Sequence, residues 1–514
     1  MSGLGGRSMD YPQGHVLGGT SSMSAFSSPN ASVSEILTRV WLDGLAYTRG
    51  SGDNYDEYAR LTKDDGWSWN NIQPYLRKNE KWTEPADHHN TSGQFDPAHH
   101  GFNGINAVSL PGFLYSFDHR VIKATSELPE FPFNVDMNSG SQIGIGWTQS
   151  TINNGERSSS ATSYLAPQFA KRKNLHVLIH ARVTRVLQTG TTLGLPVFKR
   201  VEFVDDGALS GPRKTIAAKK EVILSGGAIG TPHILQHSGI GDSKLLTKVG
   251  VKPLVHLPSV GQNLTDHPFV ANTWLVNSTD TFETPLRNES LAEQQVKQWN
   301  ETRTGPYAAS TFNLAGWLRV PKSSPIFQQF KDPSAGSRTA HYEFIIANGK
   351  TRLPLPPTGN FMVIGTVVLT PLSRGTVLIN SNNPFDRPSV DPNLMDSTFD
   401  LFVMREAIRS ARRFAKAPAF SDYVLRLEDT AVTDSELDQF IRGTAITVSH
   451  TVGTASMSPK GADYGVVDPD LRVKKVLGLR VVDSSVIPLV PAAHTQAATY
   501  VVAERASDLI KAAW

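Results

Sequence analysis

The sequence predicts a mixed α/β protein with more than one domain, on three observations. Short apolar runs that fit buried strands alternate with amphipathic stretches that fit helices. Glycine-rich turns connect the strand-like runs to the helical ones, as in α/β folds. The chain has 514 residues, of which 39% are hydrophobic, so it is long for one domain and can bury a large core. Two or three domains, or one interleaved pair, are therefore expected.

The first half of the chain supplies a strand–turn–helix unit. Residues 175–190 have the pattern of a β-rich segment, and residues 220–227 fit a buried strand that ends in glycines. A short helix then runs from Thr231, which suits its N-cap, through Pro232 at the first helical position. Gly239 suits its C-terminal cap.

The second half alternates in the same way. Residues 373–393 predict two strands with turns, and residues 399–416 predict a helix because apolar side chains recur at helical spacing. Near the end, residues 479–488 fit a strand, and residues 495–513 fit a helix whose N-terminus is capped by Thr495.

Composition excludes several classes of function. The chain has 50 basic and 47 acidic residues with no basic block, so nucleic acid is not expected as a partner. Cysteine is absent, which excludes disulfides, thiolate catalysis and cysteine-ligated metals. The longest apolar run, 361–372, is shorter than the roughly 20 residues of a membrane-spanning helix. The N-terminus lacks a charged region followed by an apolar one, so no signal peptide is expected.

Two histidine pairs and several glycosylation motifs remain to be interpreted. The pairs His88/His89 and His99/His100 lie in polar loops without ligand spacing, so we interpret them as solvated and expect no metal site. The Asn-x-Ser/Thr motifs indicate either an exported glycoprotein or chance in a chain rich in Asn, Ser and Thr. They begin at Asn30, Asn90, Asn263, Asn277, Asn288 and Asn300.

Three segments carry residues suited to chemistry. In 224–241, a helix N-terminus follows a strand through glycines, which fits either an anion site or an ordinary strand–helix unit. His450 follows an apolar stretch and precedes small residues. Asp483 ends a predicted strand, and His494 directly precedes the C-terminal helix. Two histidines near strand and helix ends form a candidate acid/base pair.

Together these segments resemble the glucose–methanol–choline (GMC) family of flavin oxidoreductases. GAIGTPHILQHSGIG (227–241) matches the second signature of that family at every defined position. SVGQNLTDHP (259–268) is similar to its V-G-x-N-L-x-D-H element, and the stretches around His450 and His494 continue the match. Within the family, DHHNTSGQF (87–95) and the C-terminal stretch 450–496 look most like fungal aryl-alcohol oxidases.

The resemblance implies FAD as the cofactor and two interleaved domains. A Rossmann-like FAD-binding segment would span 1–270, and 271–514 would form a substrate domain, built on an antiparallel sheet with helices, before returning to the FAD domain. The loop HVLGGTSS (15–22) corresponds to the FAD-contacting loop of the family. The implied cofactor-binding residues are Gly18, Gly19, Thr20, Ser21, Val183, Gly227, Asp483, His494 and Thr495.

The chain departs from the family pattern in two places. Only fourteen residues precede His15, whereas a βαβ unit with its G-x-G-x-x-G turn needs about 30. The FAD-binding domain is therefore expected to be incomplete, with an open strand edge, exposed apolar surface and poor solubility. In addition, residues 24–43 interrupt a motif that the family reads without a break. This insert, partly helical in pattern, is either a translated intron or a surface loop.

The resemblance also implies roles and partners. His450 would be the general base and His494 would hydrogen-bond the same substrate oxygen. The reaction would oxidise a primary alcohol, aryl or aliphatic, to an aldehyde by hydride transfer to flavin, with O2 as acceptor and H2O2 as product. Ser449 and the loop 345–357 lack the aromatic residues expected beside an aryl substrate. A monomeric, extracellular enzyme is expected by resemblance. The alternative is an inactive truncated member, or a gene-model artefact, that cannot hold FAD.

Overall fold

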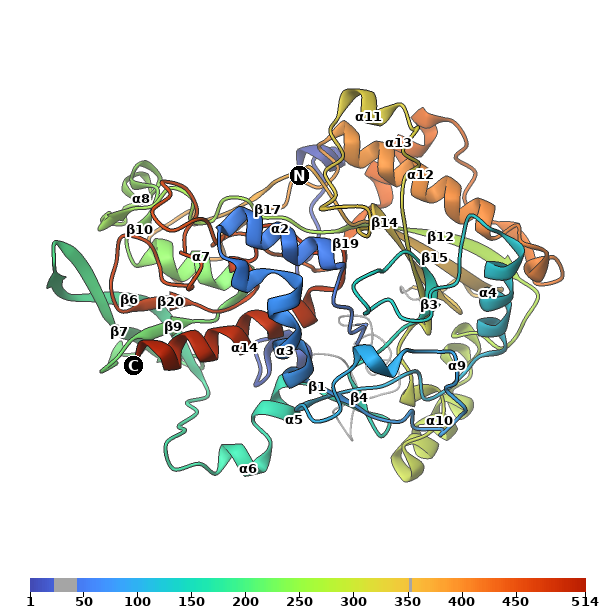
Figure 1. The fold of residues 1–514 in the computed structure, drawn as a ribbon, viewed down its shortest axis with the longest axis horizontal. Coiled ribbons are helices and arrows are strands. Elements are labelled where there is room, and N and C mark those ends of the chain that lie inside the picture. Colours follow the sequence, from blue (N-terminus) through green and yellow to red (C-terminus); the bar gives the residue numbers. More distant parts are fainter. Residues whose placement is uncertain (23–43, 351–353) are drawn as a thin grey trace.

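The computed structural model describes residues 1–22, 44–350 and 354–514, which form two bodies side by side (Figure 1). One body, on the right of Figure 1, is built on an antiparallel sheet, and the other contains the red C-terminal helix. The mixed α/β class predicted from the sequence is confirmed. The insert at 24–43 lies outside the described residues.

The antiparallel sheet has seven strands in the order β18-β12-β15-β14-β13-β3, and β19 also pairs with β12. Strand β3 comes from the first half of the chain, so the sheet joins both halves. The strands are β3 (Gly144–Trp147), β12 (Pro268–Val276), β13 (Leu314–Leu318), β14 (Tyr342–Ala347), β15 (Asn360–Val368), β18 (Val424–Leu427) and β19 (Ile446–Thr447).

The two faces of this sheet pack against different partners. Alternate residues of a strand point to opposite faces. In β14, Tyr342 and Phe344 therefore share the face that packs in one core with α12 (Thr398–Phe414). Glu343 and Ala347 lie on the other face, where Ala347 clusters with Phe312 and Ala492. This second face borders the candidate site.

The second body packs four helices around a short parallel pair of strands. The helices are α2 (Gly52–Thr62), α3 (Trp69–Asn79), α7 (Gly227–His237) and α14 (Thr495–Ala513), and the strands are β9 (Val222–Leu224) and β20 (Leu479–Val481). A three-stranded antiparallel sheet adjoins them, made of β6 (Ala181–Thr192), β7 (Leu195–Asp205) and β8 (Lys214–Ala217). Because β9 and β20 come from opposite halves of the chain, the two bodies interleave, as the family resemblance implies.

The second body exposes apolar side chains on an extended segment before β6. Val177, Leu178 and Ile179 are 47%, 68% and 56% exposed, and they lie in no described strand. Within the described residues, β9 and β20 form a sheet only with each other. The open strand edge and poor solubility expected from the sequence stay predictions.

Several predicted boundaries are wrong, for local reasons. The β-rich segment becomes a strand only at Ala181. Helix α7 begins at Gly227, so Thr231 lies inside it and its hydroxyl bonds Asp483. His494, and not Thr495, is the N-cap of α14. β20 ends at Val481, because Asp483 caps the 3-10 helix Ser484–Val486.

The remaining elements include a strand pair and a helix that the sequence predicts. The predicted strand pair within 373–393 is present as β16 (Thr376–Leu378) and β17 (Ser389–Asp391), and the helix over 399–416 is present as α12. The other strands are β1 (Glu80–Trp82), β2 (Asn106–Val108), β4 (Ile152–Asn153), β5 (Glu156–Arg157), β10 (Ile240–Gly241), β11 (Val255–His256), β16 (Thr376–Leu378) and β17 (Ser389–Asp391). The other α-helices are α4 (Ser116–Glu127), α5 (Ser160–Tyr164), α6 (Pro167–Ala170), α8 (Ser243–Lys248), α9 (Glu283–Arg287), α10 (Glu289–Thr302), α11 (Ile326–Gln329) and α13 (Asp434–Thr444).

Candidate active site

The two histidines selected from the sequence lie together where the two bodies meet. His450 follows β19 of the antiparallel sheet, and His494 is the N-cap of α14 in the second body. Their ring centroids are 4.7 Å apart, with the ring planes at 66°. His450 is 7% exposed. The structure therefore brings buried His450 beside half-buried His494, an arrangement that suits an acid/base role.

Backbone hydrogen bonds hold both histidines in place. The amide of His450 donates to Asp266 Oδ1 at 2.8 Å. Ser449 before it has a left-handed backbone with φ of 61°, and its amide donates to Thr447 Oγ1 at 2.6 Å. The amide of His494 donates to Thr48 Oγ1 at 2.8 Å. Each histidine is thus positioned by a segment that is distant in sequence.

Two further side chains contact His494, and the sequence analysis missed both. Glu343 lies on the face of β14 toward the site, and its Oε1 accepts a hydrogen bond from His494 Nε2 at 2.9 Å. Its other oxygen, Oε2, is buried without a hydrogen-bond partner in the described part of the chain. The ring of Phe312 lies 5.9 Å from that of His494. The one available signal for Glu343 was a carboxylate inside an otherwise apolar strand.

Burial keeps His450 uncharged. Burial, the charge of His494 and the neighbouring His267 together hold the pKa of His450 well below 6.5. Burial is also the main reason that the pKa of Asp266 is raised to about 6, against hydrogen bonds from Thr447 and Tyr11. A neutral imidazole has a lone pair and can accept a proton, so His450 suits the role of a general base.

The glycine loop predicted to contact FAD packs on α5. Gly18 and Gly19 have φ of 86° and 58°, and a Cβ at Gly18 would lie 2.1 Å from Ser22 Oγ. Ser160 of α5 donates its hydroxyl to the Gly18 carbonyl at 2.9 Å and its amide to Ser21 Oγ at 3.1 Å. Thr20 Oγ1 accepts from the amide of Gly14 at 3.2 Å. The hydroxyls of Thr20 and Ser21 therefore shape the loop, and contact with a cofactor stays a prediction.

The N-terminus of α7 receives a carboxylate from the chain itself. Asp483 Oδ2 accepts from the amide of Gly227 at 2.9 Å and from the hydroxyl of Thr231. Burial raises the pKa of Asp483, while hydrogen bonds from Ser485 and Thr231 oppose that rise. Of the two interpretations of 224–241, an external anion site has less support, because Asp483 already lies at the helix N-terminus.

The α14 N-terminus differs from that of α7. The side chain of His494 makes no capping hydrogen bond, so Thr495 begins a helix without a side-chain cap. In the same turn, Gln496 Oε1 is buried and accepts no hydrogen bond from the described residues. An uncapped N-terminus attracts negative charge. Val183 lies apart, on β6, paired with Phe203 of β7.

The interpretation of His100 as a solvated loop residue is wrong. Its side chain is fully buried, and its two ring nitrogens bond Glu80 and Asp136 at 2.8 and 2.7 Å. Glu80 also pairs with the buried guanidinium of Arg49. His88 has an exposed side chain, as expected. No group of three or more potential metal ligands occurs among the described residues.

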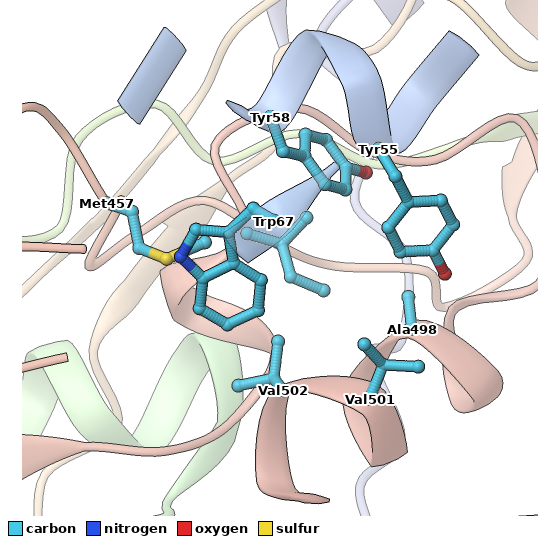
Figure 2. A pocket seen from close by; sticks show the side chains of 8 residues that line it. Tyr55, Tyr58, Trp67, Met457, Ala498, Val501 and Val502 are labelled. Carbon is cyan, nitrogen blue, oxygen red and sulfur yellow. The ribbon is translucent and has the colours of Figure 1, made fainter. Parts of the chain in front are cut away.

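Figure 2 shows an apolar cavity between α2 and α14, lined by Tyr55, Tyr58, Trp67 and Val502 among others. Its volume is about 10 Å³, which holds at most one water molecule. It is a packing gap of the second body and not a substrate site.

Within the described residues, no helix has the length and apolar character needed to cross a membrane.

Comparison with known proteins gives the family of the chain. Family models described as GMC oxidoreductase match residues 41–269 and 371–503. Dehydrogenase eriK of Hericium erinaceus is 40% identical over 98% of this chain and 82% of its own length. Pyranose dehydrogenase 3 of Leucoagaricus meleagris is 39% identical over 99% of this chain and 81% of its own length.

Solved structures share the fold. A formate oxidase of Aspergillus oryzae, in which a mutation affects FAD modification, has a TM-score of 0.83 at 26% identity and covers 98% of this chain and 84% of its own. A fungal aryl-alcohol oxidase has a TM-score of 0.83 at 23% identity over 100% of this chain and 88% of its own, which shows the common fold. The chain is therefore an oxidoreductase that belongs to the GMC oxidoreductase family.

Proposed function

We propose that this protein oxidises the CH–OH group of an alcohol to a carbonyl, with FAD as its cofactor. The observation that carries the proposal is the pair formed by buried His450 and half-buried His494, with ring centroids 4.7 Å apart. One member is a neutral base, and the other is hydrogen-bonded to a buried carboxylate, Glu343. Proton abstraction from a hydroxyl needs a base of this kind.

The residues present fit the flavin end of FAD. The uncapped N-terminus of α14 favours negative charge, which accumulates on a flavin ring when it is reduced. Gln496 Oε1 is a buried acceptor that a ring N–H group would satisfy. At Gly19 no atom lies within 4 Å of the place of a Cβ, so its bare backbone suits close approach of a phosphate. Bound there, FAD supplies the acceptor for the hydride that leaves the alcohol carbon.

The side chains of the site have separate tasks. His450 takes the hydroxyl proton, because its imidazole is neutral and its lone pair is free. His494 lies on the other side of the substrate oxygen, and its bond to Glu343 fixes its ring orientation. Phe312 and the apolar sheet face beside it exclude water from the reacting groups.

Two substrate classes follow from different observations. A primary alcohol, aryl or aliphatic, suits the apolar lining that Phe312 supplies beside His494. A pyranose sugar is the second candidate, because Glu343 Oε2 remains as a buried acceptor for a further substrate hydroxyl. Pyranose dehydrogenases of Leucoagaricus meleagris and Agaricus campestris, at 39% and 40% identity, support this second candidate. For the electron acceptor we propose O2, giving H2O2, and for the location an extracellular one.

The test starts from the purified chain. Flavin absorbance, and FAD released on denaturation, separate an active family member from one that cannot hold its cofactor. Anaerobic reduction of the flavin is then measured with benzyl alcohol, hexanol and glucose, and reoxidation with O2 and with benzoquinone. Bleaching by an alcohol supports the proposal. Retention of FAD without bleaching by any of the three classes contradicts it.

A further inference from the structure

A third buried imidazole lies directly behind His450. His267, in the turn before β12, has its Nδ1 at 2.9 Å from His450 Nδ1, with the two rings at 82°. On its far side, His267 Nε2 lies 3.2 Å from the carbonyl oxygen of Leu369. His267 is completely buried.

The partners of His267 decide where its proton lies. A carbonyl oxygen only accepts hydrogen bonds, so His267 Nε2 must carry the hydrogen that it donates to Leu369. Burial and the charge of His494 lower the pKa of His267 to about 3, so the ring carries one proton and is neutral. The Nδ1 atom of His267 consequently has no proton, and its lone pair can accept a hydrogen bond.

The proton of His450 is placed by the same logic. Two ring nitrogens 2.9 Å apart form a hydrogen bond only if one of them is protonated. His267 Nδ1 has no hydrogen, so His450 Nδ1 must donate. Because His450 is neutral, its single ring proton is used in this bond, and Nε2 is left as the basic nitrogen. The opposite tautomer would leave two lone pairs facing each other in a buried site.

One carboxylate holds the main chains of these two histidines together. Asp266 Oδ1 accepts from the backbone amides of both His267 and His450, each at 2.8 Å. Its Oδ2 accepts from the hydroxyl of Tyr11 at 2.8 Å and from that of Thr447. Asp266 therefore fixes the backbone positions from which both imidazoles extend.

We propose that His267 is a positioning residue that selects the tautomer of His450, so that Nε2 and not Nδ1 takes the substrate proton. The role in catalysis rests on the function proposed above, whereas the tautomer is a property of the folded chain. His267, in the GQNLTDHP segment (261–268), thereby takes part in proton transfer without contacting the substrate.

Nitrogen NMR of the protein labelled with ¹⁵N-histidine tests the tautomer without any turnover. The signals of His450 are identified by their loss in a His450→Asn variant. The expected pattern is a protonated Nδ1 and an unprotonated Nε2. A His450 ring protonated at Nε2 in the wild-type protein would overturn the proposal.

Two substitutions separate hydrogen bonding from packing. In His267→Leu the acceptor is lost, so the Nδ1–H signature disappears and flavin reduction by the alcohol slows about 10- to 100-fold. In His267→Asn the side-chain oxygen stands near the former Nδ1 and can accept the same hydrogen bond. The Nδ1–H signal of His450 is therefore retained, and the rate of flavin reduction stays within about threefold of wild type. His341→Leu, which removes a buried imidazole bonded to Asp332, leaves the His450 signals unchanged.

The outcomes for this proposal and for the proposed function are distinct. If the His450 signals respond as expected while no alcohol reduces the flavin, the tautomer selection holds and the function fails. If His267→Leu keeps both the wild-type signature and the wild-type rate, the positioning role is wrong. Should His267→Leu fail to fold, the wild-type spectrum and His267→Asn still decide.

Discussion

Replacing Glu80 by Gln removes one charge from the buried cluster that holds the segment next to His494. Glu80 and Arg49 both have fully buried side chains and form an ion pair. Arg49 follows Thr48, whose hydroxyl accepts the hydrogen bond from the amide of His494. Loss of the charge therefore mainly lowers the stability of the fold, and it also affects the position of His494 through Arg49 and Thr48.

The size of the effect follows from burial. Glu80→Gln keeps the side-chain volume but leaves the guanidinium of Arg49 in the interior with only neutral acceptors, the carbonyls of His99 and Asn138. Breaking a buried ion pair by removing one partner costs about 3–5 kcal/mol. We expect the free energy of unfolding to fall by this amount.

The loss in free energy of unfolding caused by Glu80→Gln depends on pH in a direction set by His100 and Glu80. Burial opposes charge on His100, but hydrogen bonds to Asp136 and Glu80 outweigh it and raise the pKa of His100 above 6.5. The stability that His100 adds is full below 6.5 and is lost as pH rises through its raised pKa. For Glu80, Arg49 and His100 outweigh burial and lower its pKa below 4.5, so its share is full above 4.5 and is lost as pH falls. The difference between variant and wild type is therefore largest between pH 4.5 and 6.5.

Urea denaturation followed by tryptophan fluorescence measures this loss, since the ring of Trp82 lies 4.2 Å from that of His100. Glu156→Gln is the matched control. It breaks the exposed pair of Glu156 and Arg303, whose side chains are 55% and 39% exposed, and we expect no measurable change. A loss below about 1 kcal/mol for Glu80→Gln at pH 5.5 would refute the reasoning from the buried pair.

Three further predictions concern the site and the surface. Because the pKa of His450 lies well below 6.5, kcat/KM with an alcohol should not fall as pH drops through 6.5, and a decline there would contradict a neutral buried base. Gly18→Ala should lower the FAD content of the purified protein, measured by released flavin, because its Cβ would meet Ser22 Oγ; unchanged content would remove this loop from the cofactor site. In protein secreted from yeast, mass spectrometry should find Asn263 unmodified, because its amide nitrogen bonds Ser456 and Pro488. Glycans should instead occupy the exposed asparagines, and a glycan at Asn263 would argue against the fold around it. The exposed ones are Asn90, Asn277, Asn288 and Asn300.

Local patterns in the sequence were enough to predict the mixed α/β class and helix α12, and the family motifs selected the two histidines as candidates. Hydrophobic spacing located α12, and the ordered motifs selected His450 and His494, because both kinds of signal lie within short stretches. Glu343 could not be found in this way, since its partner His494 is 151 positions away. The same holds for His267, which lies 183 positions from His450.

Burial of polar residues was also beyond local patterns. The loop around His100 is polar, and its histidine is buried only because Glu80 and Asp136 arrive from other segments to bond both ring nitrogens. The predicted cap of α7 was wrong for a related reason. Asp483, far along the chain, lies at the N-terminus of α7 and lets that helix begin at Gly227 instead of Thr231.

The most direct test of the account is stopped-flow reduction of the flavin by an alcohol, without oxygen, in FAD-loaded His450→Ala and His494→Ala variants. Loss of the general base should slow flavin reduction by His450→Ala about 10²- to 10⁴-fold, with the flavin spectrum retained. The His494→Ala variant should also be slower, because the substrate oxygen loses its second hydrogen-bond partner. Reduction at the wild-type rate in either variant would contradict the claim that these two imidazoles act on the substrate.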